Sequence, residues 1–147
     1  MKKNLKTLLG ACLLLAAALI LVMTVFLSEP VLPRLEYYSQ DSNYITAAGT
    51  VTHIGWSPEQ SYVYLSFVEI PEAYSDTTFV LEGENLRIVL ENGFAEKVEI
   101  GTEVVYISAP RYFWDGYAMP VVALEAGGEV LLVFEEGKAN LLDLIKK

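Results

Sequence analysis

The stretch Ile45–Ile70, ITAAGTVTHIGWSPEQSYVYLSFVEI, decides the fold more than any other part of the chain. It is rich in Val, Ile, Tyr, Phe and Thr, residues that favour extended chain. The turn-forming residues Trp56-Ser57-Pro58-Glu59-Gln60 divide it into two halves. We therefore predict a long hairpin of two strands, Ile45–Trp56 and Ser61–Ile70, which Pro71 ends.

Alternation along these strands predicts which residues share a face of the sheet. One face of the first strand would carry Ile45, Ala47, Gly49, Val51 and His53. In the second strand, one face would carry Val63, Leu65, Phe67 and Glu69, and the other Tyr62, Tyr64, Ser66 and Val68.

Short β-compatible runs continue towards the C-terminus and are separated by Gly, Pro and Asn. Gly127-Gly128 is a strong signal for a two-residue hairpin. The pattern predicts strands at Thr77–Leu81, Leu86–Leu90, Glu103–Ala109, Ala118–Ala126 and Glu129–Glu135. A helical turn is expected at Phe94–Val98 and a short amphipathic helix at Ala139–Lys147.

This order of elements resembles the OB-fold, a five-stranded Greek-key barrel. The resemblance lies in a long hairpin, a third strand, a helical turn, a strand entered through Val98-Glu99-Ile100-Gly101-Thr102-Glu103-Val104, and a closing strand. It covers about residues 45 to 135 and implies a small, mostly-β barrel. A β-sandwich is the alternative, and neither architecture identifies a specific family.

The N-terminus has a different character from the rest of the chain. Leu8–Leu27, LLGACLLLAAALILVMTVFL, contains twenty residues without a charge, enough for a membrane-spanning helix. Lys2, Lys3 and Lys6 precede it, so the positive-inside bias predicts a cytoplasmic N-terminus. We expect a cytoplasmic tail at residues 1–7, a transmembrane signal anchor at 8–27, an extended tether at 28–44 and an extracytoplasmic domain at 45–147 of a single-pass protein of the cytoplasmic membrane.

Two alternatives exist for this segment. A cleaved signal peptide would have a shorter apolar core and small residues at the cut, whereas this run ends in Val25-Phe26-Leu27-Ser28. Leu9-Gly10-Ala11-Cys12 resembles the lipobox of bacterial lipoproteins, but the longer apolar run follows the cysteine rather than preceding it. Cys12 is the only cysteine, so the predicted barrel has no disulfide.

Composition excludes several kinds of function. Ten Lys and Arg, of which three precede residue 8, leave seven basic residues against 19 acidic ones in the rest of the chain. Such a surface disfavours nucleic acid, because phosphate binding needs clustered Lys and Arg. His53 is the only histidine, which excludes a zinc site with several histidines. Asp41-Ser42-Asn43 and Glu82-Gly83-Glu84-Asn85 only hint at calcium, so we predict no catalytic residue, metal or cofactor.

The segment Arg111–Tyr117 is the one local anomaly, because it places four aromatic residues and an arginine between Pro110 and Pro120. Exposed Trp, Tyr and Arg often dominate binding energy. The alternative is that these rings cover one end of the barrel. In an OB-fold the loops after strands one and four form the usual ligand face. The predicted ligand-binding residues are therefore Trp56, Arg111, Tyr112, Trp114 and Tyr117.

The sequence thus predicts a membrane-anchored, non-enzymatic binding or assembly module. Its expected partners are a protein or a cell-envelope saccharide. An enzyme that acts on envelope polymers is the first alternative. The second is an accessory or inhibitory domain for a basic secreted partner, which the acidic surface would attract.

Overall fold

The computed structural model describes residues 12–23, 31–110 and 118–147. The chain divides into two compact units, Met1–Glu36 and Tyr37–Lys147. The second unit contains every strand of the described residues and is the part in which a functional site can be described.

The first unit contains a helix at residues 12–23, whose residues are exposed. Within the described ranges, no helix combines the length and the apolar character that crossing a membrane requires. The structure therefore contradicts the predicted transmembrane helix at Leu8–Leu27, and with it the single-pass anchoring and localisation. Residues 8–11 and 24–27 of that prediction lie outside the described residues.

Helix α2, Val31–Ser39, occupies part of the segment that we expected to be an extended tether. Pro33 falls in its first turn, where a missing backbone N–H costs no helical hydrogen bond. Tyr38 is fully buried, and the short helix η1, Asp41–Asn43, follows. The side chain of Asn43 donates to the carbonyl of Tyr37 at 2.8 Å, so the end of α2 and η1 are fixed to each other.

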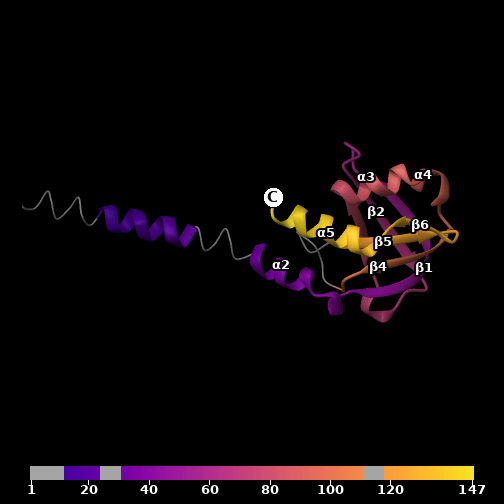
Figure 1. Cartoon of the computed structure of the whole chain (residues 1–147), viewed down its shortest axis with the longest axis horizontal. Coiled ribbons are helices and arrows are strands. Elements are labelled where there is room, and N and C mark those ends of the chain that lie inside the picture. The colour runs from indigo at the N-terminus through magenta and orange to yellow at the C-terminus, as the bar shows by residue number, and fades with distance from the viewer. Residues whose placement is uncertain (1–11, 24–30, 111–117) are drawn as a thin grey trace, which may run out of the picture. The chain divides into compact units, whose positions relative to one another are not determined.

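Five strands form a closed mixed barrel (Figure 1). They are β1 Ile45–Trp56, β2 Tyr62–Val68, β3 Thr78–Glu82, β4 Glu103–Ser108 and β5 Ala118–Ala126. Antiparallel pairs join β3 to β2, β2 to β1, β1 to β4 and β4 to β5, and the parallel pair β3–β5 closes the circle. This closed barrel agrees with the predicted resemblance to small β-barrels of the OB type.

A sixth strand, β6 Glu129–Leu132, pairs with β5 across Gly127 and Gly128. Both glycines have positive φ, 60° and 78°, as a tight hairpin turn of this kind requires. The predicted hairpin is confirmed, although its second strand ends three residues before the predicted Glu135 because α5 begins at Phe134.

The first strand matches its predicted bounds but contains a bulge. Val51 pairs with Phe67 and His53 pairs with Ser66, so Thr52 is an extra residue without a partner. The extra residue reverses the alternation beyond it. Ala47, Gly49 and Val51 are therefore buried as one face, whereas His53 is exposed and leaves that face.

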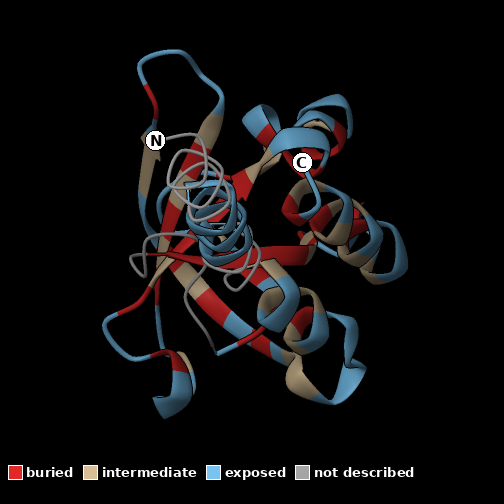
Figure 2. Cartoon of the chain, turned by 90° about the vertical axis from the view of Figure 1, so that its left-hand side faces the viewer, coloured by how far each residue is buried: buried red, intermediate tan, exposed pale blue. Residues whose placement is uncertain are grey.

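Aromatic rings fill much of the barrel interior. Phe67, Tyr74, Phe79 and Tyr106 pack with ring centroids 4.6–5.9 Å apart. Tyr74 belongs to the short helix η2, Glu72–Tyr74, and its hydroxyl donates to the carbonyl of Ser108 at 2.6 Å. The hydroxyl of Tyr106 is buried without a hydrogen-bond partner among the described residues. Figure 2 shows that the buried residues gather inside the barrel and beneath the helices.

Two helices lie between β3 and β4: α3, Gly83–Glu91, and α4, Phe94–Lys97. The predicted turn at Phe94–Val98 is confirmed, but the predicted strand Leu86–Leu90 is wrong. Leu86 and Val89 are buried at helical spacing, and Arg87 forms ion pairs with Glu84 and Glu91 one turn away on each side. Residues three and four apart are neighbours on the surface of a helix, and in an extended strand they would be about 10 Å or more apart. The short apolar run by itself does not distinguish a strand from a helix.

The C-terminal helix α5, Phe134–Ile145, begins five residues before the predicted Ala139. Glu135 and Glu136 lie in its first turn, where negative charge favours a helix. Figure 1 shows α5 beside β5. The two backbones are close at Gly137, where an added Cβ would lie 2.0 Å from the carbonyl oxygen of Val122. Only glycine allows this approach.

Candidate functional site

The aromatic site predicted from the sequence is only partly described. Trp56 ends β1, is 42% exposed and packs edge-on against Phe94 of α4, with 6.2 Å between ring centroids. Arg111, Tyr112, Trp114 and Tyr117 lie outside the described residues. Before that gap, Ser108 pairs with Ile45, the first residue of β1. Trp56 and this flank of the gap therefore lie at opposite ends of the same strand.

His53 is exposed beside the bulge in β1. No group of three or more His, Cys, Asp and Glu side chains lies close enough to hold a metal ion in the part of the chain that the structure describes.

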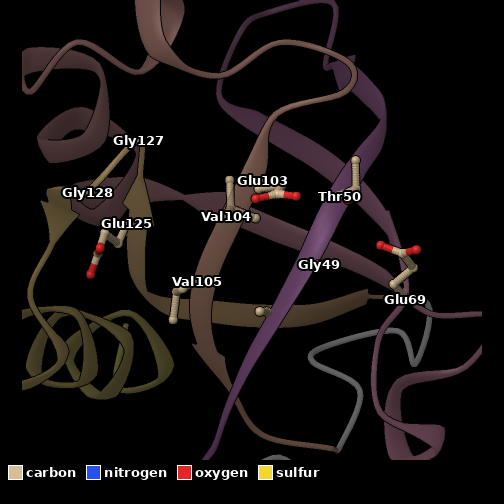
Figure 3. A pocket seen from close by; sticks show the side chains of 10 residues that line it. Gly49, Thr50, Glu69, Glu103, Val104, Val105, Glu125, Gly127 and Gly128 are labelled. Atoms are coloured by element: carbon tan, nitrogen blue, oxygen red, sulfur yellow. The ribbon is translucent and has the colours of Figure 1, made fainter.

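A groove on the outer surface of the barrel is the best-formed candidate site. It has a volume of about 440 Å³ and crosses β1, β4 and β5 (Figure 3). Its residues come from those three strands, from the end of β2 and from the β5–β6 turn: Ala48, Gly49, Thr50, Glu69, Glu103, Val104, Val105, Glu125, Gly127 and Gly128.

The register of the strands explains which side chains meet in this groove. Ala48 lies opposite Val105, which lies opposite Glu125, so these three form one row across β1, β4 and β5. In the next row Thr50 lies opposite Glu103. Because alternate residues of a strand share a face, both rows point outward. The floor of the groove is therefore built of small or β-branched residues, and Val105 is 41% exposed there.

Three carboxylates border this floor: Glu69, Glu103 and Glu125. No Lys or Arg lines the groove, and none of the three forms an ion pair with another described residue. Elsewhere on the barrel, several exposed carboxylates do have basic partners, such as Asp41 with Lys138 and Glu129 with Lys97. The groove is thus a concave surface of uncompensated negative charge.

Gly49 gives the groove its depth at one end. An added Cβ at this position would lie 2.8 Å from Cγ2 of Ile70, 3.0 Å from Cβ of Phe67 and 3.1 Å from the carbonyl oxygen of Val68. The end of β2 therefore lies directly against β1 at Gly49. The chain then turns at Glu69, whose φ of 60° is in the left-handed region. Glu69 is therefore exposed and does not share the buried face of Val63, Leu65 and Phe67, with which the alternation had grouped it.

This arrangement is suited to binding positive charge. Glu103 and Glu125 lie on neighbouring strands in adjacent rows, which separates their Cβ atoms by roughly 7–8 Å. Carboxylates at such a separation do not converge on one small cation, but they attract several cationic groups on one partner. The valine and the small residues between them allow close contact with an apolar or backbone surface.

Patterns in the sequence did not reveal this groove. Its carboxylates are distant in the chain, and each looks like an ordinary solvent-facing glutamate in its own strand. The available signal was Gly49 within an otherwise regular strand, because an interior glycine often marks a close approach of backbone.

Comparisons with known proteins do not assign this chain to a family. No protein-family model matches it. Neither the curated proteins nor the solved structures contain a match. The resemblance to small β-barrels therefore depends on the strand order and pairing of the chain itself.

Proposed function

We propose that the barrel is a non-enzymatic binding module that holds a basic, extended segment of a partner protein in the groove across β1, β4 and β5. The observation that carries this proposal is the set of three carboxylates, unpaired within the described chain, around a floor of small and β-branched residues. Of the functions expected from the sequence, this one combines the binding module with the alternative of a basic partner.

The spacing of the carboxylates supports an extended segment. Side chains at i and i+2 of a strand share a face and are about 7 Å apart, close to the roughly 7–8 Å between Glu103 and Glu125. Lys or Arg at alternate positions of the segment would then lie over the two carboxylates. The residues between them would point away from the groove, so the partner's pattern is basic at every second residue.

Charge alone would attract any basic peptide to a chain with a net charge of -9, so the test must separate the groove from the whole surface. The full-length protein would be titrated into a fluorescent nonapeptide of alternating Arg and Ala, and binding would be followed by anisotropy. A Glu-Ala peptide of the same length is the negative probe.

Two double variants with the same change in charge provide the comparison. Glu103→Gln with Glu125→Gln removes two groove carboxylates, whereas Glu135→Gln with Glu136→Gln removes two exposed ones from α5. We expect the groove variant to lose about tenfold in affinity, which corresponds to about 1.4 kcal/mol, and the α5 variant to lose much less. Equal losses in both variants would reject the groove as the binding site.

A further inference from the structure

Asn92 and Gly93 form an asparagine–glycine pair between α3 and α4. The backbone nitrogen that follows an asparagine can attack its side-chain carboxamide, and glycine obstructs this attack least because it has no Cβ. Asn92 is the only asparagine of the chain that glycine follows. It is also exposed, so water and hydroxide reach it. The sequence and the surface position together make this pair prone to chemical change.

The two groups that would react have separate partners in the folded chain. The carboxamide of Asn92 donates to the carbonyl of Leu131 on β6 at 2.9 Å. The backbone N–H of Gly93 donates to the carbonyl of Leu90 in α3 at 3.1 Å. Both hydrogen bonds must break before the nitrogen of Gly93 can reach the carboxamide, so the contact between α3 and β6 opposes the reaction.

Lys97 of α4 holds the same pair in place. Its ammonium group donates to the backbone carbonyl of Asn92 at 3.2 Å and forms an ion pair with Glu129 at the start of β6. Its side chain lies against Gly93, where an added Cβ would be 3.2 Å from Cε of Lys97. The attack requires the peptide group between Asn92 and Gly93 to rotate, and these contacts resist that rotation.

We propose that Asn92 is a site of spontaneous deamidation and that the contact of the α3–α4 turn with β6 sets its rate. When this contact opens, the deprotonated nitrogen of Gly93 forms a bond to Cγ of Asn92, and the bond from Cγ to Nδ2 breaks. Nδ2 leaves as ammonia and carries the proton that Gly93 lost. Water then opens the cyclic imide to give aspartate or isoaspartate. This inference is independent of the proposed function.

The reaction weakens the contact that slows it. A carboxylate only accepts hydrogen bonds, so an aspartate at this position would face the carbonyl of Leu131 as a second acceptor. Asn92→Asp reproduces the aspartate product. We expect it to have a lower urea midpoint of unfolding than wild type, and an unchanged midpoint would overturn this consequence.

Mass spectrometry of the full-length protein measures the rate, in the folded state and in concentrated urea, at mildly alkaline pH. Trypsin cleaves after Arg87 and Lys97, so the fragment of residues 88–97 contains Asn92 and no other asparagine. The fragment of residues 139–146 contains Asn140, which leucine follows, and serves as the internal control. The replacement of an amide NH2 by OH appears as a gain in mass.

We expect the fragment with Asn92 to gain mass and the fragment with Asn140 to stay unchanged over the same time. The rate at Asn92 should be about tenfold higher in urea than in the folded protein, because the folded chain must first break two hydrogen bonds of ordinary net strength. Equal rates in the two states would overturn the control by β6. No gain at Asn92 in urea, or a faster gain at Asn140, would overturn the site itself.

Two lysine variants separate the local contact from general stability. Lys97→Met removes the contacts with Asn92 and Glu129, and it should raise the rate in the folded protein about two- to fivefold without changing the rate in urea. Lys146→Met removes an exposed ion pair with Asp143 on α5 and should change neither rate. If both variants raise the folded rate equally, the contact of Lys97 does not control the reaction.

Discussion

Strand β5 has one half covered by a helix and one half that borders the groove, and the two halves differ in how their neighbouring polar groups are paired. Its first half, Ala118–Val122, is buried throughout, and α5 approaches its backbone at Val122. Its second half alternates, so that Leu124 is buried and Glu125 faces the groove. In the helix-covered half, the carbonyls of Pro120 and Val121 accept hydrogen bonds from the side chains of Ser108 and Asn85. The groove, in contrast, has carboxylates without ion-pair partners among the described residues.

The side chain of Asn85 shows how polar groups are paired on the helix-covered side of β5. Asn85 of α3 is 6% exposed, and its amide donates to the carbonyl of Gly137 at 2.9 Å. It also accepts a hydrogen bond from Asn140 of α5 at 3.0 Å. Buried polar groups are stabilising only when paired in this way. Substitutions on the covered side should therefore affect stability, and those in the groove should mainly affect binding.

The largest loss of stability is expected from Gly137→Ala. The new Cβ would lie 2.0 Å from the oxygen and 2.7 Å from the carbon of the Val122 carbonyl, and backbone atoms cannot rotate away. Relief requires α5 to move off β5, so we expect a loss at the upper end of about 1–3 kcal/mol. Urea unfolding monitored by circular dichroism measures it.

Gly55→Ala is the matched control for this prediction. Its new Cβ would meet only the ring of His53, with Nε2 at 3.0 Å and Cδ2 at 3.6 Å, at the end of a flexible and exposed side chain. We expect unchanged stability or a gain of up to about 1 kcal/mol, because glycine weakens a strand. If Gly137→Ala is no more destabilising than Gly55→Ala, the close contact between α5 and β5 does not exist.

Asn85→Ala should be the next largest effect. It leaves the carbonyl of Gly137 and the amide of Asn140 without their partner, and a buried unpaired group costs about 1–3 kcal/mol. Asn92→Ala removes a similar amide bond, to the carbonyl of Leu131 at 2.9 Å, from an exposed residue. Water can replace that bond, so its urea midpoint should change less than that of Asn85→Ala. Equal losses of stability in the two variants would contradict the inference that the hydrogen bonds of Asn85 are shielded from water.

The sequence predicted some elements of the fold correctly and missed others. Strand bounds followed from alternation and turn residues, so β1 was predicted correctly at both ends. The bulge at Thr52 and the helix at Leu86–Leu90 were missed, because a five-residue apolar run suits either structure and one extra residue leaves no mark. Hydropathy alone predicted a membrane helix, whereas no helix in the described part of the chain is long and apolar enough to cross a membrane.

The candidate site was less predictable than the fold for a physical reason. A groove depends on which strands become neighbours, and β1 lies beside β4 although two other strands and two α-helices separate them in the sequence. Glu69, Glu103 and Glu125 line one groove through this long-range pairing. A cluster of aromatic residues, in contrast, is visible in any short stretch of sequence. The acidic composition, which favoured a basic partner, was the part of the site visible in the sequence.

Two tyrosines in the barrel interior give a smaller contrast with opposite signs. Tyr74→Phe removes a hydrogen bond to the carbonyl of Ser108 and should cost about 1–2 kcal/mol. Tyr106→Phe removes a buried hydroxyl that has no partner among the described residues, so stability should stay equal or rise by about 1 kcal/mol. Urea unfolding of both variants at neutral pH tests the pair, and a loss in Tyr106→Phe would indicate an unrecognised partner.

Alkaline unfolding provides a second readout of the same pair. Burial raises the pKa of both Tyr74 and Tyr106 above the ordinary 10.0. The folded state then binds the phenolic proton more tightly than the unfolded state does. The stabilisation is therefore present below pH 10 and is lost as the pH rises through the folded pKa. Each Phe variant should lose less stability than wild type between pH 9 and 11. An identical loss would contradict the raised pKa values of the two tyrosines.

The smallest effects on stability should come from the groove itself. Glu103→Gln with Glu125→Gln breaks no ion pair and removes like charges from one surface, so we expect a change within about 0.5 kcal/mol, towards higher stability.

Glu84→Gln is the opposite case, because it breaks the ion pair with Arg87 on the surface of α3 and should lower stability slightly. Hydrogen bonding from Arg87 lowers the pKa of Glu84, so this small loss should disappear as the pH falls through that pKa. Urea midpoints at low and high salt measure both changes, which screening should reduce. If the groove variant is clearly less stable than wild type, the carboxylates of Glu103 and Glu125 stabilise the fold and are not reserved for binding.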